Sequence, residues 1–176
     1  MSVPRAPQRA KLIIGLIMQD RTLIEPLSGE LCASFGPLDM VSAWMSFDYT
    51  TYYEPEMGAP LSRRMLTFKG LIQQDELPAI KLATNRVEET YSLNGKRRVN
   101  IDPGYLLLER LVLASGKNFS HRIYIGDGIY ADLTLTYQHG AFIKLPWTYP
   151  DYADQPMLGF LQQVRSKYAV DLKQTG

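Results

Sequence analysis

Apolar residues dominate the first strongly patterned stretch of the chain, residues 11–19, almost without interruption. A run of this kind is typical of a strand that is covered on both faces, so we expect residues 12–18 to form a strand at the centre of a sheet. From residue 23 to residue 35 the apolar positions change to helical spacing, and Gly36 and Pro37 mark the end of the predicted helix.

Two strands, a second helix and a further strand are predicted to follow. Residues 40–49 alternate between apolar and polar side chains, as a half-buried strand does, and residues 63–72 form another strand-like stretch. An amphipathic helix that Asp75 can cap then ends near residue 95, and residues 97–101 form the next strand. This order of strand, helix, strand, strand, helix and strand predicts the split βαβ sheet of ferredoxin-like folds.

The second half of the chain predicts mainly antiparallel strands. Residues 121–125, 129–137 and 141–145 are strand-like and are separated by glycine-bearing turns, which predicts a meander. Residues 106–114 are apolar enough to be either a strand or a buried helix, and a last amphipathic helix begins after Asp154. We therefore expect an α+β fold, in which a ferredoxin-like split βαβ sheet is extended by a C-terminal antiparallel meander and a terminal helix.

The length and charge of the chain restrict its organisation and its partners. With 176 residues, we expect a single domain over residues 11–170, a disordered leader at residues 1–10 and a tail at residues 171–176. Because the chain has 19 basic and 18 acidic residues, its net charge is close to zero, and we do not expect a nucleic-acid partner. The first apolar run is too short to cross a membrane. The single cysteine, Cys32, is expected on the buried stripe of the first helix and indicates a reducing compartment, so we expect a cytoplasmic protein of bacterial type.

Signatures of several common catalytic and nucleotide-binding sites are missing from the sequence. The pairs Gly95-Lys96 and Gly116-Lys117 lack the upstream glycine and the hydroxyl residue of a phosphate-binding loop, and residues 126–128 lie in a predicted hairpin. Paired zinc histidines, a serine nucleophile elbow and a calcium-binding loop are also missing, and the acidic residues between 48 and 56 are expected to be solvated. We therefore predict no metal site, and the sequence leaves the cofactor unknown and enzyme activity open.

The first candidate segment for chemistry contains Asp102 and Tyr105 on either side of Pro103-Gly104. We expect a turn there, at the end of a strand. Asp102 either accepts hydrogen bonds within that turn or serves a ligand as an acid or base.

The second candidate segment contains His121, Arg122 and Tyr124. Imidazole is the side chain best suited to proton transfer near neutral pH, although a histidine at a strand start is more often a structural hydrogen-bonding group. Strand alternation separates His121 from Arg122, unless the strand begins after them.

The third candidate segment, residues 145–152, places Trp147, Tyr149, Asp151 and Tyr152 among two prolines. Such a stiff aromatic stretch either packs over the open end of a sheet or forms a wall for a planar or sugar-like ligand.

Together these segments resemble a known family. The resemblance extends from about residue 11 to residue 168 and is to the bacterial and archaeal family known as domain of unknown function 4416, which implies no established activity. Some members of that family are labelled GTP-binding proteins. Here a phosphate loop is missing and Ala83-Thr84-Asn85-Arg86-Val87 does not match a guanine-reading Asn-Lys-x-Asp motif, so we expect guanine nucleotides to bind weakly or not at all. The segments that carry the resemblance are residues 48–50, 52–54, 57–58, 100–105, 121–124 and 145–152.

Two hypotheses on function follow. In the first, the candidate residues form a pocket for a small molecule such as a nucleotide or a phosphorylated metabolite, with Asp102 or His121 as acid or base. In the alternative, the chain is a non-catalytic protein–protein interaction module that uses residues 50–57 and the aromatic segment. Convergence on one concavity would support the first hypothesis, and a flat exposed aromatic patch the second. The residues expected to bind the ligand are Tyr105, Arg122, Tyr124, Trp147, Tyr149, Asp151 and Tyr152.

Overall fold

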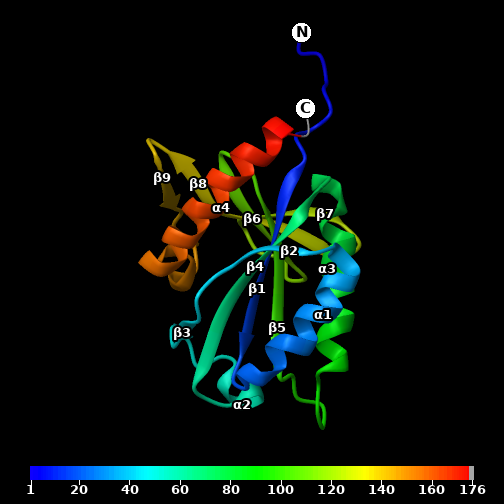
Figure 1. Cartoon of the computed structure of the whole chain (residues 1–176), viewed down its shortest axis with the longest axis vertical. Helices are drawn as coiled ribbons and strands as arrows, with labels where there is room; N and C mark the ends of the chain where they lie inside the picture. Colours follow the sequence, from blue (N-terminus) through cyan, green and yellow to red (C-terminus); the bar gives the residue numbers. More distant parts are fainter. Residues whose placement is uncertain (175–176) are drawn as a thin grey trace.

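The strand β1 (Ala10–Met18) lies in the middle of a nine-stranded sheet in the computed structural model, which describes residues 1–174 (Figure 1). It pairs antiparallel with β4 (Leu61–Ile72) on one side and with β5 (Val99–Leu106) on the other. Every residue of β1 is buried, as the unbroken apolar run predicts. The prediction of a central first strand is therefore confirmed.

The predicted meander extends this sheet and does not form a second one. The hydrogen-bonded order is β2-β4-β1-β5-β6-β8-β7, with β3 added to β4 and β9 to β8, and all pairs are antiparallel. Residues 106–114 contain the end of β5, a hairpin turn and most of β6, so the strand alternative holds there. The remaining strands are β2 (Leu38–Val41), β3 (Met45–Phe47), β6 (Arg110–Ser115), β7 (Arg122–Gly126), β8 (Ile129–Gln138) and β9 (Ala141–Lys144).

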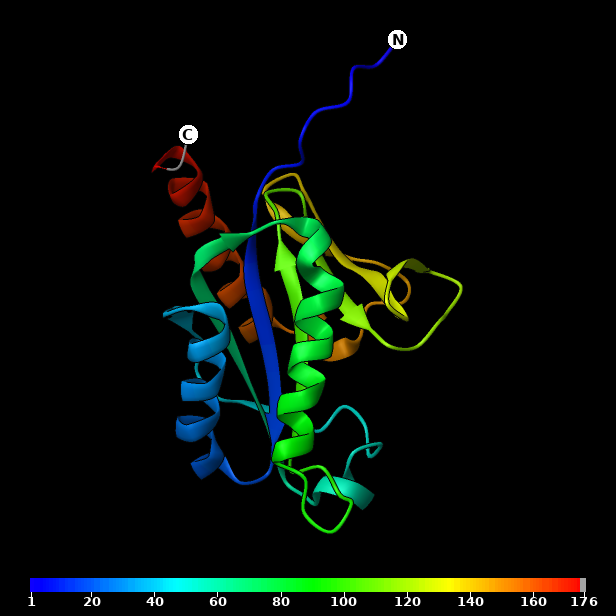
Figure 2. The same ribbon diagram turned by 90° about the vertical axis from the view of Figure 1, so that its right-hand side faces the viewer.

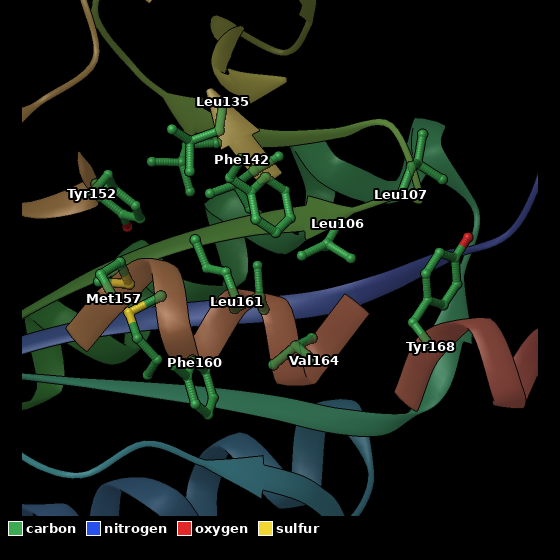
Figure 3. Close-up of a cluster of buried hydrophobic side chains, with 14 of the residues drawn as sticks. Leu106, Leu107, Leu135, Phe142, Tyr152, Met157, Phe160, Leu161, Val164 and Tyr168 are labelled. Carbon is green, nitrogen blue, oxygen red and sulfur yellow. The ribbon is translucent and has the colours of Figure 1, made fainter. Parts of the chain in front are cut away.

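Helices cover both faces of the sheet because the side chains of β1 alternate between two cores. Leu12, Ile14 and Leu16 pack against α1 (Ile24–Phe35) and α3 (Leu77–Thr90), which lie side by side in Figure 2. On the opposite face, the buried side chains of α4 (Gln155–Gln174) pack against β5, β8 and β9, as Figure 3 shows. The predicted apolar face of this last helix is confirmed. The short helices are η1 (Arg21–Leu23), α2 (Glu54–Met57), η2 (Gln74–Glu76) and η3 (Pro150–Ala153).

The strand predicted at residues 40–49 is broken into β2 and β3. The reason is Ser42, whose buried side-chain hydroxyl accepts the backbone N–H of Met65 at 2.9 Å and so takes the place of a ladder bond. Trp44 follows in the break and lies under the guanidinium groups of Arg21 and Arg64.

The expected turn at Pro103-Gly104 is wrong, because both residues lie inside β5. Glycine is required here by a close approach of β6. A Cβ atom added at Gly104 would lie 2.3 Å from the backbone oxygen of Val112. Pro103-Gly104, a residue pair typical of turns, therefore marks the point where β5 and β6 begin to pair.

Near Gly104 the sheet opens into a fork. β5 and β6 pair only from Gly104 to Leu106, whereas β5 continues to pair with β1 back to Val99. The edge of β5 that β6 leaves uncovered is met by α3, since Lys81 Nζ donates to the backbone oxygen of Ile101 at 2.8 Å and Glu88 accepts the N–H of the same residue. Side chains of a helix thus satisfy backbone groups that a neighbouring strand would otherwise pair.

Some expectations about the periphery are corrected or fall outside the description. Cys32 is half-buried, not buried. The helix α4 continues through residues 171–174 of the predicted tail, and residues 175 and 176 lie outside the described residues. Within residues 1–174, no helix is long and apolar enough to cross a membrane.

Candidate functional site

A cavity of about 640 Å³ occupies the fork between β5 and β6. Its walls come from the sheet, from α3, from the loop after β3, from the loop after β6 and from η3. We call it the fork cavity, and it is lined by Phe47, Tyr49, Thr50, Tyr52, Tyr53, Arg63, Lys81, Asn85, Glu88, Arg97, Asn100, Asp102, Leu113, Ala114, Ser115, Gly116, Lys117, Arg122, Asp132, Tyr149, Pro150, Asp151 and Tyr152.

Arg63 of β4 is a buried cation that lines the fork cavity, with 4% of its surface exposed. Its guanidinium group lies between the rings of Phe47 and Tyr152, 5.0 and 4.7 Å from their centroids. Its Nη2 atom is 2.9 Å from Oδ2 of Asp151. Its Nε and Nη1 atoms are buried and have no hydrogen-bond partner. A buried donor without a partner costs about 1–3 kcal/mol, so Arg63 carries two unsatisfied N–H groups in a side chain that lines the cavity.

Asp102 of β5 lies on the same face of the sheet, across β1 from β4. Its register partner on β1 is Gly15, and the missing side chain of Gly15 leaves room for the hydroxyl of Tyr152. One carboxylate oxygen of Asp102, Oδ2, accepts from Asn100 Nδ2 at 2.7 Å. The other, Oδ1, is 3.7 Å from Lys81 Nζ, which is beyond hydrogen-bond distance.

Burial and nearby carboxylates raise the pKa values of several ionisable groups of the cavity. Burial raises the pKa of Asp151, although the charge of Arg63 opposes the shift. Burial also raises the pKa of Tyr53 and of Tyr152, and the charge of Asp102 adds to both shifts. These phenols therefore stay protonated at neutral pH and can donate hydrogen bonds.

Asp132 of β8 organises the opposite wall of the cavity. Its Oδ2 atom accepts from Arg122 Nε at 2.8 Å and lies 3.2 Å from His121 Nε2. The imidazole stacks on the indole of Trp147, with 5.0 Å between the ring centroids and 12° between the planes. Trp147 Nε1 in turn donates to the backbone oxygen of Leu133 at 2.8 Å. Because β7 begins at Arg122, alternation does not separate His121 from Arg122, and both reach one carboxylate.

The family of the chain follows from its comparison with known proteins. The family described as domain of unknown function (DUF4416) matches residues 8–168. The chain belongs to the DUF4416 family. The resemblance read from its motifs is thereby confirmed, and the matched range contains every residue of the fork cavity. No curated protein and no solved structure matches this DUF4416 chain.

The fork cavity of this DUF4416 domain brings together part of the predicted site. Asp102, Arg122, Tyr149, Asp151 and Tyr152 all line it. They come from β5, from β7 and from the aromatic segment, which are far apart in the sequence.

The other predicted site residues do not line the cavity. His121 and Trp147 lie directly behind its wall and reach it through Asp132, so a role for His121 in proton transfer stays a prediction. Tyr105 packs among apolar side chains, and Tyr124 is exposed and contacts Tyr130.

Several cavity residues of this DUF4416 domain were not predicted from sequence, above all Arg63, Lys81 and Asp132. A signal for Arg63 does exist, since Arg63 directly precedes Arg64 and the apolar pair Met65-Leu66 in a strand-like stretch. Lys81 and Glu88 also share the inward face of α3 with apolar residues. Within residues 1–174, no group of three or more His, Cys, Asp or Glu side chains is placed to hold a metal ion.

Proposed function

We propose that this protein binds a small molecule through an anionic group, which is held in the fork cavity by Arg63. The observation that carries the proposal is that Arg63 lines the cavity and has two buried N–H groups, Nε and Nη1, without a hydrogen-bond partner. A guanidinium group is suited to carboxylates and phosphates because it carries a permanent positive charge and several N–H donors in one plane. The nucleotide-like or phosphometabolite-like ligand expected from the sequence belongs to this class.

The size and lining of the cavity support a small-molecule ligand. Small-molecule pockets have volumes of roughly 300–1,000 Å³ and combine aromatic walls with a few polar groups. The fork cavity, at about 640 Å³, lies in this range and includes Phe47, Tyr53 and Tyr149 as aromatic walls. Arg122 provides a second cation, and Asp102 is the carboxylate best placed for proton transfer to a bound ligand. His121 acts as a positioning residue, because it reaches the cavity through Asp132.

The test measures binding of inorganic phosphate, phosphate monoesters and small carboxylic acids by thermal shift and titration calorimetry. We expect Arg63→Lys to weaken the best probe by at least about tenfold, since lysine keeps the charge but loses the planar set of donors. Arg64→Lys is the matched control, because Arg64 lies over Trp44 and does not line the cavity. If Arg63→Lys lowers the melting temperature strongly, the neutral pair Arg63→Met with Asp151→Asn replaces it. Equal binding by folded Arg63 variants and by the Arg64→Lys control would overturn the proposal.

A second candidate function is the protein–protein interaction module. It is supported by Tyr52 and Tyr149, two aromatic residues at the cavity that are 61% and 56% exposed. Exposed tyrosines are common anchors of protein interfaces. Size-exclusion chromatography with light scattering on the wild-type chain and on Tyr52→Ser with Tyr149→Ser tests self-association, and a stable monomer in both would remove a homodimer from consideration.

Two broader proposals concern fold relationship and location. The order β2-β4-β1-β5, with α1 and α3 on one face, supports a ferredoxin-like relationship for the first half of the sheet. A half-buried free cysteine, Cys32, is compatible with a reducing cytoplasm.

A further inference from the structure

The fork cavity offers an open acceptor in addition to its open donors. Asp102 Oδ1 lies beyond hydrogen-bond distance from Lys81 Nζ, and 28% of the Asp102 side chain is exposed. Its other oxygen is occupied by Asn100. A ligand can therefore donate to Asp102 Oδ1 without displacing an existing hydrogen bond.

Arg63 and Asp102 are placed to act on one ligand. They lie on the two strands that flank β1, since Arg63 is in register with Ile17 and Asp102 with Gly15. The positions Ile17 and Gly15 share one face of β1, and the hydroxyl of Tyr152 lies over Gly15 on that face. Both side chains line the same cavity.

The charges of the cavity lining nearly cancel. Five cationic and four carboxylate side chains line it. Arg63, Lys81, Arg97 and Arg122 each have a carboxylate within 4.0 Å, and the remaining cation, Lys117, contacts Tyr52. A lining of this kind has little excess positive charge for a polyphosphate, and it is complementary to a ligand that carries one charge of each sign.

We propose that the ligand is a zwitterion of amino-acid type, with its carboxylate on the guanidinium group of Arg63 and its ammonium group on Oδ1 of Asp102. The proposal rests on the proposed anion site and adds the requirement for a cationic donor. The phenol and phenyl groups of Tyr53 and Phe47 provide surface for the rest of the molecule.

The test compares each L-amino acid with the 2-hydroxy acid that has the same side chain, by thermal shift and then by calorimetry. For the best amino acid we expect wild-type affinity at least about tenfold above that of its hydroxy analogue, because a charged donor to a carboxylate is stronger than a neutral one. In Asp102→Asn this preference should fall to less than about threefold, while the hydroxy acid keeps its affinity or gains. Asp127→Asn, at an exposed hairpin turn, is the matched control and should keep the full preference.

The outcomes separate this proposal from the one on which it rests. Equal affinity for amino and hydroxy acids, both dependent on Arg63, would overturn the zwitterion and leave the anion site in place. The same holds if inorganic phosphate or phosphate monoesters bind through Arg63 and no amino acid does. If no probe depends on Arg63, both proposals fail.

Discussion

Arg63 is the side chain on which the proposed binding site depends. A buried guanidinium group is costly unless it is paired, and here one carboxylate and two aromatic faces compensate part of that cost. The compensation is incomplete because Nε and Nη1 have no partner. The proposed anion site rests on these two unsatisfied donors of Arg63.

Gly104 lets β6 approach β5 closely at the point where the fork opens. We expect Gly104→Ala to destabilise the protein by about 1–3 kcal/mol, because the new methyl group would collide with the backbone of β6 and force the strands apart. Gly70→Ala is the matched control, since Gly70 is also in a strand, is exposed and has no atom within 4 Å of an added Cβ. Urea unfolding of both variants measures the difference. Similar stability of the two would mean that β6 does not approach Gly104 as described.

At the scale of elements, α3 substitutes for a strand along the open edge of β5. Glu88 and Lys81 bind the backbone N–H and oxygen of Ile101, which do not pair with β6, so the helix satisfies both groups. The arrangement places a buried carboxylate beside the fork cavity, and burial raises the pKa of Glu88.

This raised pKa predicts a pH-dependent stability. The folded state holds the Glu88 proton more tightly than the unfolded state, so its stabilising contribution is complete below pH 4.5 and is lost as the pH rises through the folded pKa. Glu88→Gln keeps an acceptor for Ile101 and does not titrate. We therefore expect the stability of Glu88→Gln, relative to wild type, to increase as the pH rises through this interval.

Urea unfolding between pH 4 and pH 8 measures the effect for Glu88→Gln. Glu89→Gln, at the exposed neighbouring position, serves as the control and should follow wild type throughout. A Glu88→Gln difference that stays constant or shrinks with rising pH would contradict the raised pKa.

The sequence predicted those elements whose pattern is set by burial on one or both faces. β1, α1, α3, the meander and α4 all have a strong apolar period. It failed where a tertiary contact changes the backbone locally. The hydroxyl of Ser42 interrupts a strand by bonding Met65, and the approach of β6 selects a glycine inside β5 at Gly104.

At the scale of the whole molecule, the site depends on the order of the strands, which local patterns do not reveal. The sequence singled out Asp102, Arg122 and Asp151, since polar and aromatic residues gather in its second half. It could not place Arg63 beside them, because β4 is brought to this region by its pairing with β1 and by the return of η3.

The near-neutral cavity and the missing phosphate loop lead to a prediction about GTP. We expect no magnesium-dependent GTP binding tighter than about 1 mM, because the sequence lacks a glycine-rich phosphate loop and the cavity lining has only one cation more than it has carboxylates. Calorimetric titration with GTP and Mg²⁺ measures this, with ATP as a comparison for unspecific binding. Micromolar, magnesium-dependent binding together with GTP hydrolysis would contradict it.

The position of η3 after all nine strands has a consequence for synthesis on the ribosome. Domains generally begin to fold from their N-terminal part as the chain emerges. Arg63 and its strand therefore become available long before Asp151, and until η3 arrives the buried cation has no counter-ion and the fork cavity lacks a wall. Occupancy of the cavity thus becomes possible only after residues 150–153 have been synthesised and have docked on the sheet.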